Sequence, residues 1–303
     1  MHDESSNQYR SGYVAIVGRP NVGKSTLLNH LVKQKISITS RRPQTTRHTI
    51  LGVHTLPHAQ IVYVDTPGIH ADGKRAMNRY MNRAATNMLE DVDVILFVVE
   101  SLRWIREDEH VLAQLEKYPQ PIFLVINKVD LIPKKEELLP WISELKGKAD
   151  FRDIIIVSAL RNDRLDLLEQ EIIKALPKQE NFFPEEQLTN RSLRFMAAEI
   201  VREKLTRSLS KELPYSLTVA IEQFKEEPGL ISIGAVIWVE RKGQKAIVVG
   251  KEGKQIKKIG QSARIDLEKL TGEKVYLQLW VKVREGWSDD ERALRSLGYE
   301  EQR

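Results

Sequence analysis

The chain has 303 residues, with 47 Lys and Arg against 42 Asp and Glu, so its formal net charge is +5. Its length predicts two domains at roughly 100–200 residues each, and 41% apolar residues suffice for sizeable cores. The absence of cysteine excludes disulfides, thiolate metal sites, iron–sulfur clusters and cysteine nucleophiles. The seven histidines show no spacing typical of zinc sites. The modest basic excess is compatible with a polyanionic partner.

Neither a membrane span nor a secretory signal is expected. The longest uninterrupted apolar run covers residues 94–99, far short of the ~20 residues that a membrane-spanning helix needs. The N-terminal segment MHDESSNQYRSG is polar and lacks the apolar stretch of a secretory signal. We therefore expect a soluble intracellular protein.

Between residues 13 and 176, short apolar runs alternate with helical patterns. Several runs are continuous Val, Ile and Leu stretches, which is typical of strands covered on both faces. Strands are predicted over residues 13–17, 50–54, 60–64, 94–99, 122–126 and 154–157. Helices are predicted over residues 24–33, 74–89, 107–117, 134–146 and 164–175. This order predicts an α/β domain with a mostly parallel sheet, whose ligands bind beyond the carboxyl ends of the strands.

The segment after the first strand matches the phosphate-binding pattern GxxxxGK[ST]. Its glycines let backbone N–H groups surround phosphates, and the N-terminus of the following helix adds its positive dipole end. We expect Lys24 to reach the β- and γ-phosphates and the Ser25 hydroxyl to bind Mg²⁺. The nucleotide contacts predicted here are Gly18, Arg19, Pro20, Asn21, Val22, Gly23, Lys24, Ser25 and Thr26.

The third strand runs into Asp65-Thr66-Pro67-Gly68-Ile69, and all five residues are predicted to contact the nucleotide. An Asp in this position can hold Mg²⁺, and Gly68 leaves room for a backbone N–H to reach the γ-phosphate. Ile69 stands where Ras-like proteins carry the glutamine that orients water. Because an apolar side chain cannot polarise water, we expect slow intrinsic hydrolysis that depends on a partner, a reorganised loop or an ion.

The fifth and sixth predicted strands end in Asn127-Lys128-Val129-Asp130 and Ser158-Ala159-Leu160, which resemble elements of the GTPase superclass. The Asp130 carboxylate can accept hydrogen bonds from N1–H and the 2-amino group of guanine, whereas adenine offers neither in that position. The Lys128 stem can lie along the base, and the Ala159 N–H can meet the guanine carbonyl. All seven residues are therefore predicted to bind a guanine nucleotide.

A polar, basic segment between residues 33 and 50 contains Gln44-Thr45-Thr46-Arg47-His48, which resembles the first mobile loop of the bacterial Era-type GTPases. In this class a threonine of that loop closes onto Mg²⁺ and the γ-phosphate. We favour Thr46, with Thr45 as the alternative. The predicted metal ligands are Ser25, Thr46 and Asp65. The predicted catalytic residues are Lys24, Thr46, Asp65 and Gly68.

The C-terminal part has a different pattern. Residues 177–191 contain two prolines with little periodicity and are predicted to be a linker. An amphipathic helix over residues 192–211 is followed by alternating strands over 215–223 and 230–240. A basic, glycine-bearing segment over residues 243–260 leads into a helix to about residue 270, a strand over 274–284 and a short helix over 289–297. This order predicts a smaller α+β domain.

Residues 241–274 hold ten Lys and Arg against four Asp and Glu. Within them, residues 247–256 resemble the KH signature of nucleic-acid-binding domains, and the element order resembles its type II form. Two glycines let the turn approach four backbone nucleotides, lysines neutralise phosphates, and apolar neighbours can line a groove for unstacked bases. The predicted RNA-binding residues are Ile247, Val249, Gly250, Lys251, Glu252, Gly253, Lys254, Ile256, Lys257 and Lys258.

The combination of motifs over residues 10–299 resembles the bacterial Era family of GTPases. The resemblance implies a GTPase domain over residues 10–177, a linker over 178–191, a type II KH domain over 192–287 and a C-terminal helix and tail over 288–303. It implies GTP, GDP and Mg²⁺ as cofactors, and binding to the 3′ end of 16S-type small-subunit rRNA in maturation of the 30S ribosomal subunit.

The resemblance also implies a location in the cytoplasm, with peripheral attachment to the inner membrane. The sequence shows no lipidation motif and no clean amphipathic anchor for that attachment. We expect a monomer.

Two other classes compete with this interpretation. A P-loop kinase or ATPase is disfavoured by the guanine-type strand ends, and a screen of nucleotides would separate it from a GTPase. An RNA-modification GTPase of the same branch would need a second catalytic centre, but the chain has no Cys and no flavin or folate signature. Recovery of the bound RNA would separate that class.

Overall fold

The computed structural model describes residues 9–40, 42, 45–68, 76–209, 213–297 and 299. By its contacts the chain divides into two compact units. The first unit is Met1–Ser37, Thr46–Gly73 and Met81–Asn190, and the second is Ile38–Thr45, Lys74–Tyr80 and Arg191–Arg303. The predicted domain ranges assign two short segments, Ile38–Thr45 and Lys74–Tyr80, to the GTPase domain, whereas by contacts they group with the C-terminal unit.

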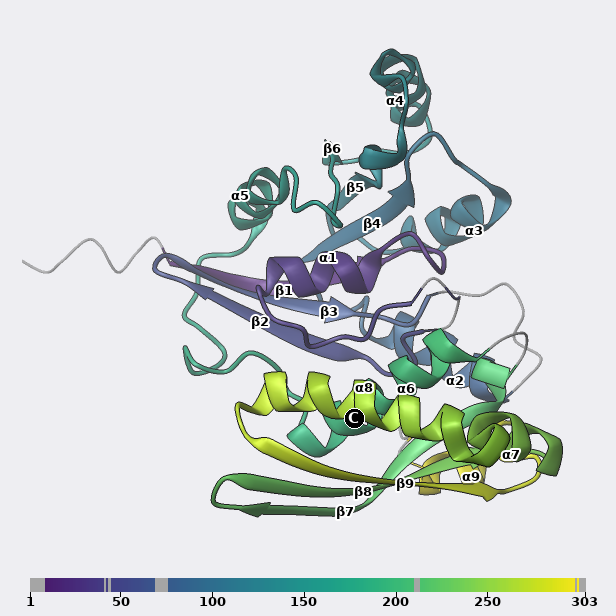
Figure 1. Cartoon of the computed structure of the whole chain (residues 1–303). Coiled ribbons are helices and arrows are strands. Elements are labelled where there is room, and N and C mark those ends of the chain that lie inside the picture. Colours follow the sequence, from purple (N-terminus) through teal and green to yellow (C-terminus); the bar gives the residue numbers. More distant parts are fainter. Residues whose placement is uncertain are drawn as a thin grey trace, which may run out of the picture. The chain divides into compact units, whose positions relative to one another are not determined.

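The first unit is built on a six-stranded sheet of order β2-β3-β1-β4-β5-β6 (Figure 1). Its strands are β1 (Arg10–Val17), β2 (Ile50–Leu56), β3 (Ala59–Asp65), β4 (Val94–Glu100), β5 (Ile122–Asn127) and β6 (Asp153–Ile156). β2 pairs with β3 in the antiparallel sense, and the remaining neighbours are parallel. β3 is buried over its whole length, as strands covered on both faces are.

Five helices flank this sheet. They are α1 (Lys24–Leu31), α2 (Ala76–Asn87), α3 (Arg106–Leu115), α4 (Leu138–Lys146) and α5 (Leu165–Ala175), although the first residues of α2, up to Tyr80, group with the second unit. Apolar residues of the strands, such as Phe97, form one core with Val111 of α3 and Leu145 of α4. α1 contacts β1, β3 and α5. The predicted α/β fold with a mostly parallel sheet is confirmed, with element boundaries shifted by a few residues.

The second unit contains a three-stranded sheet of order β7-β8-β9. Its elements are α6 (Leu193–Ser208), β7 (Leu217–Glu227), β8 (Leu230–Val239), α7 (Lys242–Val249), α8 (Lys254–Thr271), β9 (Lys274–Val283) and α9 (Glu291–Ser296). β7 and β8 are antiparallel, while β8 and β9 are parallel. The core combines residues of α6, the sheet and α8, among them Leu205, Ile233 and Ile259. The predicted α+β domain is confirmed.

One element of the second unit differs from the prediction. The sequence predicts a single helix emerging from the basic segment 243–260, but the structure has two helices, α7 and α8, separated by a turn. The residues of α7, KGQKAIVV, include a glycine and a β-branched run and so have low helix propensity. Burial of Val248 in the core outweighs that local preference.

Within the described residues, no helix combines the length and the apolar content that crossing a lipid bilayer requires.

Candidate nucleotide and RNA sites

The predicted phosphate-binding loop joins β1 to α1 through two glycines with positive φ. Gly18 has φ 154° and Gly23 has φ 107°. A Cβ atom on Gly18 would lie 2.4 Å from the carbonyl oxygen of Val98, and one on Gly23 would lie 2.3 Å from Nδ2 of Asn127. Both glycines are therefore required by the close approach of neighbouring strand ends as well as by the turn.

Lys24 lies inside this loop. Its Nζ donates hydrogen bonds to the carbonyl oxygens of Gly18 at 2.8 Å and Arg19 at 3.0 Å. Burial lowers the pKa of Lys24 to about 8, against the charge of Asp65, which raises it. The arrangement places a desolvated cation where the loop would surround phosphates.

Asp65, the last residue of β3, is fully buried and gathers three hydroxyl groups. Its Oδ2 accepts from Oγ of Ser37 at 2.8 Å, Oγ of Ser25 at 2.9 Å and Oγ1 of Thr46 at 3.4 Å. Thr46 Oγ1 also lies 2.8 Å from Ser25 Oγ. Burial raises the pKa of Asp65, opposed by the charge of Lys24 and by these hydrogen bonds.

The three predicted metal ligands, Ser25, Thr46 and Asp65, thus lie together, and one carboxylate oxygen of Asp65 is available to bind a cation. Oδ1 of Asp65 is buried and has no hydrogen-bond partner among the described residues. Carboxylate and hydroxyl oxygens are ligands that Mg²⁺ prefers. Ser25, Thr46 and Asp65 therefore fit a Mg²⁺ ion, which would supply positive charge to phosphate oxygens. Thr45 is directed elsewhere, because its Oγ1 donates to the carbonyl oxygen of Arg42 at 2.7 Å.

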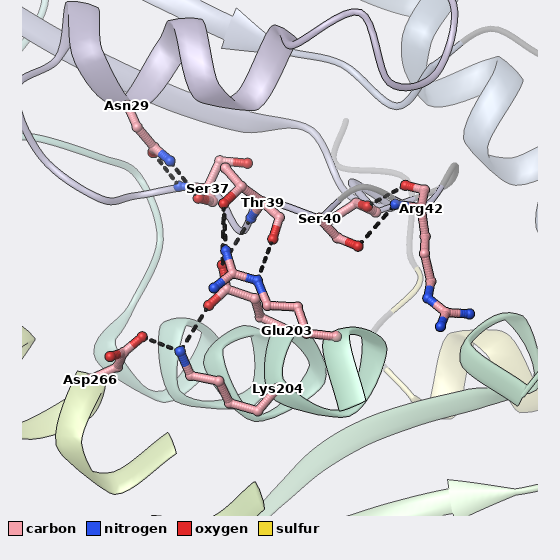
Figure 2. Close-up of polar contacts among 10 residues, drawn as sticks. Asn29, Ser37, Thr39, Ser40, Arg42, Glu203, Lys204 and Asp266 are labelled. Atoms are coloured by element: carbon pink, nitrogen blue, oxygen red, sulfur yellow. Dashed lines mark hydrogen bonds and ion pairs between the residues drawn. The ribbon is translucent and has the colours of Figure 1, made fainter. Parts of the chain in front are cut away.

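Two residues that the sequence analysis missed hold the start of the first mobile loop. Asn29 of α1 accepts at Oδ1 from the backbone N–H groups of Ile36 at 3.0 Å and Ser37 at 2.9 Å. Its Nδ2 donates to the Ser37 carbonyl oxygen at 2.7 Å, and Figure 2 shows the side chain reaching from α1 to that residue. A single Asn on a helix and a Ser in a polar loop form no recognisable motif.

The side chain of Arg19 turns away from the phosphate-binding loop. Its Nε donates to both carboxylate oxygens of Asp108 at 3.1 Å, and its Nη2 donates to Glu100 at 2.9 Å. Glu100 also pairs with Lys128, whose Nζ lies 3.3 Å from Oε1. We therefore expect Arg19 to contact a nucleotide through its backbone and not through its guanidinium group. Thr66 behaves similarly, since its hydroxyl donates to the carbonyl oxygen of Ile16 at 3.1 Å.

The predicted base-binding motifs are joined by Asn127. Its Nδ2 donates to the carbonyl oxygen of Val22 at 2.8 Å, and its Oδ1 accepts from the backbone N–H of Ala159 at 2.9 Å. Ser158 Oγ donates to Oδ1 of Asp130 at 2.5 Å. The phosphate loop and both base motifs are therefore fixed to one another, with the Asp130 carboxylate oriented by a neighbouring hydroxyl.

The turn after β3 and the loop after β6 carry further predicted nucleotide contacts. A Cβ atom on Gly68 would lie 3.1 Å from Pro20, so the Asp65–Gly68 turn closely approaches the phosphate loop. Leu160 is 72% exposed. Ile69 lies outside the described residues, and the slow hydrolysis expected from it stays a prediction.

Replacing the base-reading carboxylate tests the choice of nucleotide. Asp130→Asn is expected to weaken GTP binding about 10- to 100-fold, because a hydrogen-bond acceptor for guanine is exchanged for a group that also donates. XTP binding should improve, since xanthine offers an acceptor there. Competition among GTP, XTP and ATP measures the change, with Asp163→Asn as a control on an exposed side chain of the Ser158 loop. Preference of the unmodified protein for ATP would refute the guanine assignment.

In the second unit, the turn between α7 and α8 carries the predicted RNA contacts. Gly250 has φ 72°, Glu252 has φ 53° and Gly253 has φ 73°. A Cβ atom on Gly250 would lie 2.6 Å from Cβ of Gln255, whereas one on Gly253 would meet no described atom within 4 Å. Packing therefore fixes Gly250, while Gly253 borders open space that another molecule can enter.

The surroundings of this turn are basic and partly apolar. The side chains of Lys251, Lys257 and Lys258 are exposed. Lys254 pairs with Glu252 at 3.0 Å in an exposed contact that contributes little stability.

The apolar residues predicted to line a groove differ in exposure. Ile247 is 56% exposed, while Val249 and Ile256 pack partly against the core of the second unit. Ile247 is therefore the one of the three with most surface free for a base.

Two family descriptions match separate parts of the chain. Residues 13–128 match a family described as 50S ribosome-binding GTPase, and residues 212–288 match the KH domain family. The first range holds the phosphate loop, Asp65 and Asn127, and the second holds the glycine turn.

Curated proteins and solved structures are similar over nearly the whole length. GTPase Era of Pseudomonas aeruginosa is 54% identical over 299 residues, covering 99% of this chain and 98% of that protein. GTPase Era of Actinobacillus pleuropneumoniae serotype 5b is 57% identical over 289 residues, covering 95% of each chain. A point variant of Aquifex aeolicus Era bound to GDP·AlF4⁻ matches with a TM-score of 0.93 and 42% identity, covering 96% of this chain and 99% of that one. Era in complex with MgGDPNP and nucleotides 1506–1542 of 16S ribosomal RNA matches with the same TM-score and coverage at 41% identity.

Proposed function

The chain belongs to the Era family of GTPases. From that membership we propose that it binds the 3′ end of small-subunit rRNA and assists maturation of the 30S subunit under control of GTP. Its reaction is the hydrolysis of GTP to GDP and phosphate, with Mg²⁺ as cofactor. The resemblance to this family drawn from the sequence is confirmed.

The nucleotide site supplies a role for each predicted catalytic residue. Lys24 would provide positive charge to the β- and γ-phosphates, and the backbone N–H of Gly68 would donate to the γ-phosphate. Ser25, Thr46 and Asp65 would hold a Mg²⁺ ion through their hydroxyl and carboxylate oxygens. Because Thr46 belongs to the first mobile loop, its hydroxyl would reach the ion differently with GTP and with GDP, which is what a switch requires.

The observation that carries the RNA assignment is the turn at Gly250–Gly253, which lies between two helices in a basic segment and has open space beside Gly253. A backbone turn of this kind can approach a phosphodiester chain while flanking lysines neutralise its charge. The choice of RNA is supported by the similar Era structure that contains nucleotides 1506–1542 of 16S ribosomal RNA.

Crosslinking the protein to RNA in growing cells tests the identity of the partner. Sequencing of the attached fragments is expected to show the 3′ end of small-subunit rRNA enriched at least about tenfold over other rRNA segments, a conservative threshold beside the ~10³-fold or larger preference of specific over non-specific nucleic-acid binding. The control is the Gly253→Asp protein, which should lose that enrichment. Recovery of tRNA or large-subunit rRNA in its place would overturn the proposal.

For location we extend the proposal to the cytoplasm, with peripheral attachment to the inner membrane, and to a monomer. The support is the family resemblance. Separation of cell extracts into cytosol and washed membranes would test the first statement, and light scattering of the purified protein the second. A wholly membrane-bound protein or a stable dimer would contradict them.

A further inference from the structure

The segment Ile38–Thr45 of the first mobile loop belongs by contacts to the second unit. Its chain neighbours Ser37 and Thr46 belong to the first unit, and both donate hydrogen bonds to Oδ2 of Asp65. The described residues of this segment are thus held within the KH-containing unit, while the segment is covalently joined at both ends to predicted Mg²⁺-site residues or their neighbours. Whatever holds this segment also limits where Ser37 and Thr46 can lie.

The contacts of this segment centre on Thr39, whose polar groups are bonded to α6. Oε1 of Glu203 accepts from the backbone N–H of Thr39 at 3.0 Å. Arg207 donates through Nε to the Thr39 carbonyl oxygen at 3.0 Å and through Nη2 to its hydroxyl at 2.8 Å. Glu203 and Arg207 also pair with each other at 3.0 Å. Figure 2 shows the Glu203 side chain directed from its helix toward Thr39.

The same helix holds the rest of the segment. Arg202 donates to the carbonyl oxygen of Thr45, the residue directly before Thr46. Arg42 donates to the carbonyl oxygen of Leu209, just after the end of α6. The start, the middle and the end of the segment are therefore each bonded to α6 or to the residue following it.

Glu203 also connects α6 to the helix that carries the RNA turn. It is fully buried, and its Oε2 lies 3.3 Å from Nζ of Lys204. Lys204 in turn pairs with Asp266 of α8, the helix that begins directly after Gly253 (Figure 2). Because Glu203 is fully buried, its carboxylate depends on Arg207 and Lys204 to offset the cost of burying its charge.

We propose that Glu203, with Arg207, is a positioning residue that couples the nucleotide site to the RNA site. Through Thr39 it fixes the segment whose ends place Ser37 and Thr46 beside Asp65, and through Lys204 and Asp266 it connects that segment to α8. Closure of Thr46 on the nucleotide thereby changes the RNA affinity, and by reciprocity bound RNA changes the GTP affinity by the same factor. The inference rests on the proposed binding of rRNA.

The test compares RNA binding in two nucleotide states. A labelled 3′-terminal small-subunit rRNA oligomer is titrated with full-length protein loaded with GDP or with a GTP analogue. For the unmodified protein we expect the two Kd values to differ at least about fivefold, the lower end of typical coupling. Glu203→Gln and Arg207→Gln are expected to bring the ratio to within twofold of one. Each variant should keep its GDP affinity and its RNA affinity in the GDP state within threefold.

The two variants and a control separate coupling from stability. The Arg207 side chain is about half exposed, so its replacement is expected to leave the fold intact even where that of the buried Glu203 does not. Arg194→Gln on the same helix is the matched control, because Arg194 bonds the carbonyl oxygen of Ile221. It should keep the unmodified ratio. A purely structural role would weaken binding in both states and leave the ratio unchanged.

The failures of the two proposals are distinguishable. Absence of RNA binding by the unmodified protein in either state removes the proposed function, and with it this inference. RNA binding with equal Kd values in both states removes the inference alone. A ratio that survives in both Glu203→Gln and Arg207→Gln also removes it.

Discussion

Lys24→Ala is expected to reduce GTP turnover at least ~1,000-fold, the upper range for loss of one group that stabilises developing charge. The ammonium group lies inside the phosphate loop, bonded to two carbonyl oxygens, and its lowered pKa reflects desolvation on burial. Its removal relieves that desolvation, so the thermal unfolding midpoint should change by no more than a few degrees.

Turnover is measured as phosphate released from GTP at saturating nucleotide and Mg²⁺. Lys117→Ala is the control, because that lysine is exposed beyond the end of α3. Undiminished turnover in the Lys24→Ala protein would show that the loop does not act as the phosphate site. Turnover lost together with the folded state would show a structural role.

Gly253→Asp is expected to weaken binding of the rRNA oligomer at least about 100-fold, since a carboxylate would stand where a phosphate approaches and repel it. The fold should persist, because a Cβ atom at this position meets no described atom within 4 Å and Asp tolerates positive φ better than most residues. GTP binding by the first unit should stay within twofold of the unmodified value.

A second glycine provides a matched control. Gly229, in the turn between β7 and β8, has φ 79° and equally open surroundings among the described residues. Gly229→Asp therefore introduces the same charge and the same backbone strain away from the RNA turn. Fluorescence anisotropy at one salt concentration compares the three proteins. Equal curves for Gly253→Asp and the unmodified chain would remove the KH assignment.

The parts of the site that sequence predicts well are those in which one ligand demands a fixed spacing. The phosphate loop, the turn at Asp65 and the base motif at Asn127 each follow a strand directly, so strand order alone brings them to one edge of the sheet. Local sequence does not decide between Thr45 and Thr46, because both are hydroxyl residues in a polar loop. The direction of each side chain is set by neighbours distant in the chain.

Long-range contacts without a motif are the parts that sequence does not reveal. Thr39 and Glu203 are separated by 164 positions, and neither residue type is unusual where it stands. Asn29 and Ser37 meet only because the chain turns back after α1. The helix α7 is missed for a related reason, since its β-branched residues favour extended structure until Val248 is buried.

The assignment of Ile38–Thr45 and Lys74–Tyr80 to the second unit has a consequence for dividing this protein into parts. Cutting the polypeptide after Asn190 would not separate the two units, because the N-terminal fragment would still contain two segments of the second unit, Ile38–Thr45 and Lys74–Tyr80. Ile38 and Tyr80, both buried in the intact chain, would lose their surroundings and face water. The same division constrains exchange of the C-terminal half between relatives by recombination. A new C-terminal half would have to pack with the two N-terminal segments that belong to the second unit.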